Sequence, residues 1–579
     1  MSLEAILSRI AGGESVSQTE LLPFICLEDR DERADVNYRL AEAYFKCGGD
    51  ENLERASVFV QRAWQLSSFR ADLLPLYTQI HAALDDVPKI REAYKRLGMA
   101  AAARGDVSAA ITYFDLWQYA YMQFKRLDKF EYDIDILDCV NSLARPHRFS
   151  HKPRRNILNS GKIRVAYLVK GITELGSILI KVNLLFARYH DRSRFEPMFF
   201  VPESESAVTA SEAGREHIRQ FESLGYRVIT APDSGATQEQ LRGVARKIYD
   251  MRSDLLVSSG ALTQFQHYYI TSLRPAPFVV SFVQGPPPQF APPDLDGGIA
   301  WSKHPLIDCP LDSVRVPLRG DLPERDKITA YEKQELSIPD HALVVASAGR
   351  YVKFQEPAFW RALVDLLHEF PQIYYLVMGP DESQIPFLPD VLTPESKARM
   401  RFLGWRGGDS YLRALCLVDV LIDTFPSGGG ATLLDPLALG IPCVSFENDY
   451  MKLFDQTDWS VADEFIEIPE LVVPRWDFEQ MKRIVGRLLA DEKYRSEVAH
   501  RSQEYILETR ANPPLSIREC EDSYLRFIER KLSRDDSSLD ARSAAVEKWT
   551  RPAPRWVARA ALELKRVLRF GVRVLDRVA

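Results

Sequence analysis

The sequence predicts an all-α N-terminal domain followed by two α/β units, each built on a parallel sheet. Residues 1–145 place apolar side chains at helical spacing and contain few prolines. After residue 160, apolar runs of strand length alternate with amphipathic helical stretches, and this pattern starts again near residue 340. Such alternation is typical of parallel sheets that helices cover on both faces.

The helical domain, which we place at residues 1–150, contains two segments of similar design, at 36–66 and 91–121. Each has Tyr with Ala or Leu on one helix face, then a glycine-containing turn (CGGD or ARGD), then a second amphipathic helix. The pattern resembles tetratricopeptide (TPR) hairpins, although the two segments lie further apart than the usual repeat. A TPR-like array and an ordinary helical bundle both fit these residues.

The first α/β unit is placed at residues 160–325, after a polar and basic connector. Its expected strands are 163–169, 195–201, 226–231, 254–260 and 278–284. The second unit is placed at 326–535. Its expected strands are 342–349, 373–379, 398–405, the end of 410–425, and 441–446, and its main helices are 357–371, 477–509 and 516–533. Two tandem units of this kind suggest a nucleotide-binding enzyme with its ligand between the carboxyl ends of both sheets.

Composition limits the classes of function. The chain has 579 residues, 46% hydrophobic and 27% charged, as in ordinary globular proteins. Its formal net charge of -7 is small for this length, so we expect no nucleic-acid partner. Seven cysteines occur without a CxxC pair, which argues against a disulfide framework or a structural zinc site. With no signal-peptide layout and no run of about 18 apolar residues, a cytoplasmic protein is expected.

Three consecutive glycines, Gly428, Gly429 and Gly430, follow an expected strand and precede an expected helix. Backbone N–H groups and a helix dipole at such a position hold phosphate, and glycine lets a ligand approach the backbone closely. Thr432 can donate its hydroxyl to a phosphate oxygen, and Asp435 can accept hydrogen bonds from a ribose. A plain strand-to-helix turn is the alternative.

The stretch DTFPSGGGATLLDPLALGIPCV (423–444) resembles the donor segment of GT-B glycosyltransferases. It is most similar to the family of the O-linked N-acetylglucosamine protein transferase and the HMW1C-type N-glycosyltransferases. The stretches at 346–371 (with Lys353 before a Pro), 273–288 (LRPAP) and 402–415 (FLGWRGGDSYLRAL) agree with the family, as does the domain order. The resemblance implies a GT-B fold with a donor cleft between two Rossmann-like domains.

The resemblance also implies an inverting transfer from a UDP-sugar, which serves as donor substrate, with neither a metal nor another cofactor. Lys353 would bind the β-phosphate and offset its charge as the leaving group departs, and Arg350 would assist. The acceptor would be a protein side chain that the helical domain helps to position. A saccharide or lipid-linked glycan acceptor, and a non-catalytic TPR scaffold with a degenerate transferase domain, are the alternatives.

Two departures from the family concern side chains that it often carries. Gly430 and Ala431 stand where a His or Asn often precedes the Thr, and the loop KGITELGSI (170–178) lacks the His that is often found there. The general base is therefore sought elsewhere. His267, beside Gln264 in QFQHYY, is the candidate, with simple packing among aromatic residues as the alternative.

Two further patterns are interpreted separately. Asp294 with Asp296, and Asp133 with Asp135, match the DxD spacing of metal-dependent transferases, but neither pair follows a strand in the right unit, so no metal site is expected. Residues 545–579 hold nine Lys or Arg against three acids, and their apolar residues recur at helical spacing. This predicts a basic amphipathic helix that contacts an anionic membrane surface through 551–579, or packs on protein.

Overall fold

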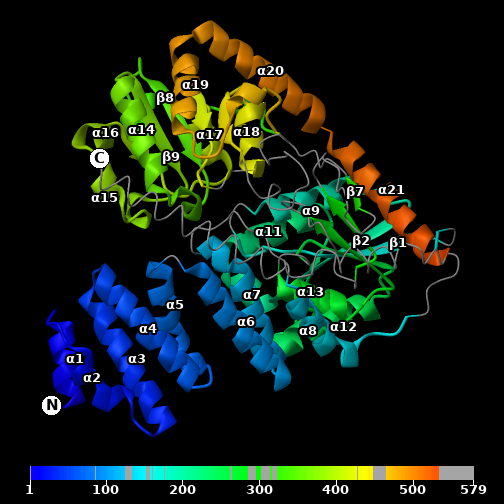
Figure 1. Cartoon of the computed structure of the whole chain (residues 1–579). Helices are drawn as coiled ribbons and strands as arrows, with labels where there is room; N and C mark the ends of the chain where they lie inside the picture. The colour runs from blue at the N-terminus through cyan, green and yellow to red at the C-terminus, as the bar shows by residue number, and fades with distance from the viewer. Residues whose placement is uncertain are drawn as a thin grey trace.

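A helical region followed by two parallel sheets makes up the protein, as the sequence predicts (Figure 1). This architecture is seen in a computed structural model. It describes residues 2–84, 86–123, 133–151, 157–158, 161–174, 177–260, 264–283, 295–300, 313–315, 322–426, 428, 430–447, 465–510 and 512–533. Gly429, Asp294 and the basic segment 545–579 lie outside the described residues.

The helical region packs as antiparallel hairpins. Its helices are α1 (Leu3–Ala11), α2 (Gln18–Ile25), α3 (Arg30–Cys47), α4 (Asp50–Leu66), α5 (Leu74–Ala83), α6 (Val87–Ala103), α7 (Val107–Gln123) and α8 (Ile134–Ala144). Hairpins α3–α4 and α6–α7 occupy both segments that the sequence singled out. Gly48 and Gly105 turn them with φ of +76° and +75°, and among the described residues no atom beyond the adjoining residues lies within 4 Å of either Cβ position. These glycines are therefore required by the backbone conformation and not by space.

Two separate cores divide the helical region. Helices α1–α5 share one core with part of α6. The rest of α6, with α7 and α8, joins a core that includes Ala166 and Leu168 of the first sheet. In Figure 1, α6–α8 accordingly stand against the first α/β unit, whereas α1–α4 extend away from it. The second half of the helical region is thus built into the first unit.

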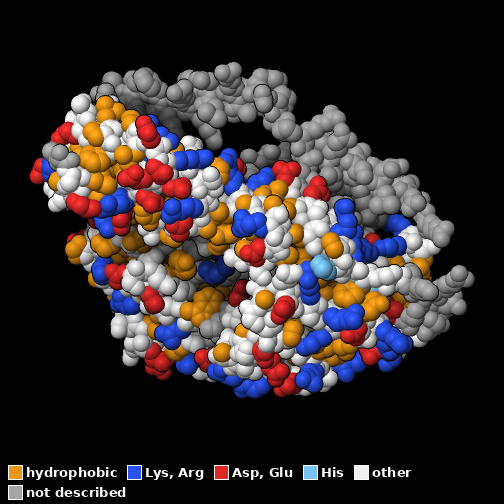
Figure 2. Space-filling view, turned by 90° about the horizontal axis from the view of Figure 1, so that it is seen from below, with side chains coloured by type: hydrophobic (Ala, Val, Ile, Leu, Met, Phe, Trp, Pro, Cys, Tyr) orange, Lys and Arg blue, Asp and Glu red, His pale blue; other side chains and the backbone are white. Residues whose placement is uncertain are grey.

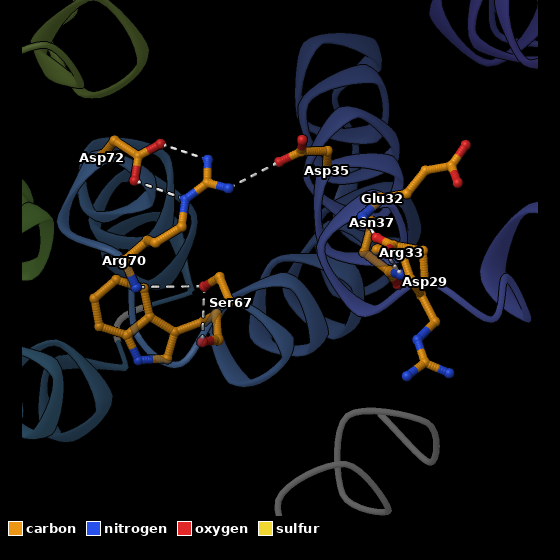
Figure 3. Close-up of polar contacts among 9 residues, drawn as sticks. Asp29, Glu32, Arg33, Asp35, Asn37, Ser67, Arg70 and Asp72 are labelled. Atoms are coloured by element: carbon orange, nitrogen blue, oxygen red, sulfur yellow. Dashed lines mark hydrogen bonds and ion pairs between the residues drawn. The ribbon is translucent and has the colours of Figure 1, made fainter.

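The turn between α4 and α5 is fixed to α3 by surface ion pairs (Figure 3). The Arg70 guanidinium contacts Asp72 at 2.7 Å and Asp35 of α3 at 3.2 Å. The Ser67 hydroxyl donates to the Trp64 carbonyl and accepts from the Arg70 N–H. The side chains of Arg70, Asp35 and Asp72 are exposed, so these ion pairs contribute little stability beyond the core beneath them.

The first sheet is parallel, with the strand order β3-β2-β1-β4-β5-β6-β7. Its strands are β1 (Ile163–Leu168), β2 (Phe195–Ser204), β3 (Val228–Ala231), β4 (Leu255–Ser258), β5 (Phe278–Val283), β6 (Gly297–Ala300) and β7 (Ser313–Arg315). Its helices are α9 (Ile178–Tyr189), α10 (Glu205–Ala210), α11 (Glu212–Ser223), α12 (Thr237–Asp250) and α13 (Phe265–Ser272).

Strands β6 and β7 were not expected from the sequence. Strand β6 opens with two glycines, which are poor strand formers. A Cβ atom on Gly297 would lie 2.7 Å from the Phe527 ring, so tertiary packing demands the residue that local propensity disfavours.

The second sheet repeats the same order, β10-β9-β8-β11-β12-β13, and is also parallel. Its strands are β8 (Leu343–Ala348), β9 (Ile373–Met378), β10 (Met400–Phe402), β11 (Val420–Ile422), β12 (Cys443–Phe446) and β13 (Val472–Val473). Its helices are α14 (Pro357–Glu369), α15 (Leu388–Val391), α16 (Pro394–Ala398), α17 (Gly408–Leu415), α18 (Leu434–Ala438) and α19 (Phe478–Ala490).

Two C-terminal helices connect the units. Helix α20 (Glu492–Arg510) packs on α18 and α19 of the second unit, and α21 (Pro513–Leu532) packs on α9 and β6 of the first. A buried network fastens α21: His190 Nδ1 and the Asp191 N–H both contact Glu521 Oε1, at 2.6 and 2.7 Å. The hydroxyl of Tyr167 meets that of Tyr524 at 3.1 Å. The chain therefore crosses back to the first unit after completing the second.

Candidate active site

Each sheet reverses its strand order beside its first strand, between β1 and β4 in the first unit and between β8 and β11 in the second. Loops leaving such a pair of neighbouring strands diverge to opposite faces, which opens room for a ligand at the carboxyl edge. We call these places the first and second switch points. The sequence-predicted donor residues follow β8 and β11, so they belong to the second.

The loop after β8 is held rigidly. Gly349 and Gly379 end neighbouring strands, and a Cβ atom on Gly379 would lie 1.8 Å from the Gly349 carbonyl oxygen, so only glycine permits this approach. A short 3-10 turn, Tyr351–Phe354, carries Lys353. The Trp360 indole donates to the Phe354 carbonyl at 2.7 Å, which ties that turn to α14.

Lys353 spans the second switch point. Its ammonium group donates to the carbonyl oxygen of Gly428, which follows β11. Burial lowers the pKa of Lys353 to about 8, while Asp423 raises it and Arg350 lowers it further. Lysine with a pKa of about 8 is still mostly protonated at pH 7. Lys353 and Gly428, predicted from separate stretches of sequence, therefore lie together.

Asp423 supports this arrangement and was not singled out in the sequence. It is 2% exposed, accepts from the Thr424 N–H at 2.8 Å and from the Ser445 hydroxyl at 2.6 Å. A Cβ atom on Gly428 would lie 2.7 Å from Asp423 Oδ2. Gly428 is therefore required, at least in part, by packing on this carboxylate. An acidic residue that ends an apolar strand was the available sequence signal.

The residues after the glycines form a short 3-10 helix, Gly430–Leu433, and then α18. Gly430 has φ of +53°, in the left-handed region that favours glycine. Thr432 lies in the 3-10 helix. Because α18 has only five residues, its dipole adds less than the longer helix that a phosphate site usually uses.

Asp435 lies on α18 and faces the first unit. Burial raises the pKa of its carboxyl, and Lys181 on α9 opposes that rise. The Tyr411 hydroxyl on α17 is buried and has no hydrogen-bond partner within the described part of the chain, and Asp435 lies within electrostatic range of it. Asp435 therefore lies within electrostatic range of the first unit.

Arg350 lies within electrostatic range of groups at both switch points. It is exposed at the mouth of the β8 loop, and its charge acts on Tyr119 of α7, on Lys170 after β1 and on Lys353. Groups from the helical region, the first unit and the second unit thus converge at one junction. The face seen in Figure 2 is hollowed near its middle, and basic and acidic side chains are interspersed over its described part.

His267 lies in the interior near the first switch point. It is 0% exposed, and its Nδ1 atom is 3.3 Å from the Ser258 hydroxyl. Burial lowers the pKa of His267 to about 3, and Lys170 adds to that effect. A base this weak and this enclosed is poorly suited to take a proton from an acceptor. The role of His267 as general base stays a prediction, and the burial of this side chain argues against it.

Three of the four aspartates with DxD spacing, Asp296, Asp133 and Asp135, have structural partners, and Asp294 lies outside the described residues. Asp296 Oδ2 contacts the Arg274 guanidinium at 2.7 Å and accepts from the Val279 N–H, and Asp296 Oδ1 contacts Lys531. Asp133 and Asp135 share the Lys95 ammonium at 2.6 and 3.0 Å. These ion pairs account for the three carboxylates without a ligand.

Among the described helices, none combines the length and apolar character needed to cross a membrane.

Comparison with known proteins gives the architecture a context. The sequence matches no family model and no curated protein. The structure is similar to a lysine-to-methionine variant of the O-GlcNAc transferase of Thermobaculum terrenum, with a TM-score of 0.53 and 16% identity over 94% of this chain and 98% of that one. A glycosyltransferase from Rickettsia africae aligns with 65% of this chain and 100% of its own at 11% identity, with a TM-score of 0.46. The helical region and the two parallel sheets together have the GT-B glycosyltransferase fold.

Proposed function

We propose that this protein transfers a sugar from a UDP-sugar to a protein side chain, with inversion at the anomeric carbon. The observation that carries the proposal is the contact between Lys353 and Gly428 across the second switch point. It brings a cation and a glycine-bearing turn to the carboxyl edge of a parallel sheet, where nucleotides bind in such folds.

The donor diphosphate would lie against the turn at Gly428–Gly430. In the reaction, the acceptor oxygen bonds to the anomeric carbon, and the bond from that carbon to the β-phosphate oxygen breaks with its electron pair left on the phosphate. Lys353, mostly protonated at pH 7, would exchange its carbonyl partner for this oxygen and offset the growing charge. Arg350 at the mouth would supply a second positive charge.

Thr432 and Asp435 complete the donor site in this proposal. The Thr432 hydroxyl would donate to a phosphate oxygen, and the Asp435 carboxylate would accept hydrogen bonds from the ribose hydroxyl groups. Both residues are only half-buried, on the segment that follows the glycines. No described residue donates a hydrogen bond to the Asp435 carboxylate, so its acceptor positions are available within that part of the chain.

A protein acceptor is favoured by the extent of the structural similarity. The likeness to the protein named O-GlcNAc transferase extends over 94% of this chain, and thus over the helical region as well as both sheets. Part of that region, α6–α8, is fused to the first unit and brings α7 to the junction. N-acetylglucosamine is the first sugar to test.

A thermal-shift screen of nucleoside diphosphates and their sugars tests the donor. UDP at a hundredfold its dissociation constant should stabilise the protein by about 2.7 kcal/mol. Incubation with labelled UDP-N-acetylglucosamine, UDP-glucose and UDP-galactose and fractions of host cells should then place the label in protein. Label in lipid extracts would indicate a glycan acceptor, and UDP binding without turnover would indicate a scaffold.

A further inference from the structure

A polar cluster at the first switch point has no part in the donor site. Its members are Asp115 and Tyr119 of α7 and Lys170, which follows β1. We call Asp115, Tyr119 and Lys170 the acceptor cluster. Asp115 and Tyr119 are four residues apart on one helix, so their side chains lie on the same face, one turn apart.

Contacts with α13 hold the α7 part of the cluster in place. The rings of Phe114 and Trp117, which flank Asp115 on α7, contact the Phe265 ring with centroids 5.6 and 6.4 Å apart. Asp115 Oδ1 accepts from the Phe265 N–H at 2.6 Å, so the carboxylate also caps α13. A helix fixed in this way presents its polar groups without further ordering, which favours binding and catalysis.

The acceptor cluster joins two elements by a direct hydrogen bond. The Lys170 ammonium donates to the Tyr119 hydroxyl at 2.7 Å and lies 5.3 Å from the centre of the same ring. Burial raises the pKa of Asp115 to about 7, opposed by the N–H of Phe265 and by Lys170. Burial lowers the pKa of Lys170, opposed by Glu174 and Asp115. The carboxylate is thus close to half-ionised at neutral pH.

Two buried polar atoms beside the cluster have no hydrogen-bond partner among the residues that the structure describes. They are Gln264 Oε1, at the N-cap of α13, and His267 Nε2, on the first turn of that helix. Buried polar groups are nearly always satisfied, so unpartnered ones in a native structure point to a bound group or a water molecule. They lie on the helix that Asp115 caps, and Lys170 is within electrostatic range of His267.

We propose that the acceptor cluster is the acceptor subsite, in which Tyr119 and Lys170 hold the acceptor hydroxyl and Asp115 takes its proton. The inference rests on the proposed function, which supplies the donor. As the acceptor oxygen bonds to the anomeric carbon, its proton passes to Asp115, while the electron pair of the broken bond stays on the departing diphosphate. The helical region then contributes directly to the reaction through α7.

Three substitutions test the assignment. Asp115→Asn keeps an oxygen that can accept from the Phe265 N–H but cannot take a proton. Tyr119→Phe and Lys170→Met remove the two groups that hold the hydroxyl. Asp106→Asn is the matched control, because Asp106 caps the start of the same helix at an exposed position, accepting from the Ala109 N–H at 3.0 Å.

Two readouts separate the subsite from the donor site: calorimetric binding of UDP, and UDP release from the three labelled UDP-sugars with host-cell protein. All four variants should bind UDP within twofold of the wild type. Asp115→Asn should lower turnover at least a hundredfold, Tyr119→Phe and Lys170→Met should lower it at least tenfold with a raised acceptor KM, and Asp106→Asn should leave it unchanged.

Failure of the inference and failure of the proposed function would give different results. If Asp115→Asn binds UDP and turns over like the wild type, Asp115 is only a cap for α13 and the inference is wrong while the proposed function stands. If the wild type neither binds UDP nor releases it from a UDP-sugar, the proposed function fails and the inference with it. Asp115→Ala gives a further check, since loss of the cap alone should lower thermal stability, whereas Asp115→Asn should not.

Discussion

The two switch points share one strand order and differ in what fills them. In the part of it that the structure describes, the second is centred on backbone, glycine and Lys353, which lies close to the buried Asp423. The first is filled by side chains from α7, the β1 loop and α13, several with displaced pKa values. The fold alone therefore does not decide the chemistry at a switch point. Glycines pack closely on a carboxylate and a strand end at one, and a neighbouring helix brings polar groups to the other.

The largest expected effect comes from removing the cation at the second switch point. Lys353→Ala should lower turnover of a UDP-sugar by about a hundredfold or more, because removing one group aimed at developing charge costs this much in other enzymes. Lys397→Ala, an exposed lysine of the same unit that pairs with Glu382, is the control. UDP release measures both. Turnover of Lys353→Ala within threefold of the wild type would contradict the assignment of the donor site to the second switch point.

The pH dependence of kcat/KM should show the contributions of the first and second switch points in one experiment. As pH rises through about 7, Asp115 loses its proton and becomes able to act as a base, so kcat/KM should rise. As pH rises through about 8, Lys353 loses its charge and kcat/KM should fall. Lys170 and the Phe265 N–H face Asp115, and Asp423 and Arg350 face Lys353.

The measured profile should therefore be bell-shaped, with its maximum between about pH 7 and 8. Lys353→Arg should lose the alkaline limb, because arginine stays charged, and keep the acidic one. A flat profile across this range, or an acidic limb that survives unchanged in Asp115→Asn, would contradict the assignment of one limb to each switch point.

A smaller effect is expected from Gly428→Ala. The added Cβ would lie 2.7 Å from Asp423 Oδ2, and the hydrogen bonds of that carboxylate limit its movement. Such overpacking costs about 1–3 kcal/mol. Gly407→Ala is the matched control, with ordinary φ of -119° and no atom within 4 Å of its Cβ position. Thermal unfolding compares the two, and equal stability would show that the turn at Gly428 is not packed on Asp423.

The smallest effect should come from a substitution in helices α1–α5, far from both switch points. Arg70→Ala removes the exposed ion pairs to Asp72 and Asp35, shown in Figure 3, and should lower stability by less than about 1 kcal/mol. UDP affinity and turnover should not change. A loss of turnover in this variant would mean that the core of α1–α5 acts on the active site, against the separation seen in the packing.

The strand and helix order of both units could be predicted from the sequence, since buried parallel strands appear as short apolar runs between amphipathic helices. Strands β6 and β7 could not, and for β6 the reason is that Gly297 is explained by Phe527, a residue distant in the chain. The division of the helical region into two cores was equally hidden. Periodicity shows that a helix has an apolar face and does not show which partner covers it.

The donor residues could be predicted because they lie in continuous motifs around Lys353 and Gly428. Asp423 was missed, since its role depends on Ser445, which the fold brings to it from the next strand. The acceptor cluster was missed for the same reason. Asp115 and Lys170 are far apart in sequence and meet only when α7 packs on the first sheet, so neither stands out in its own stretch.

The most direct test of this account is hydrogen exchange of the whole chain with and without saturating UDP. If the second switch point binds the donor, UDP should slow exchange in 349–356 and in 421–440, and leave α7 and the loop after β1 close to their free rates. Protection confined to the first switch point, or no protection in either loop of the second, would contradict the account.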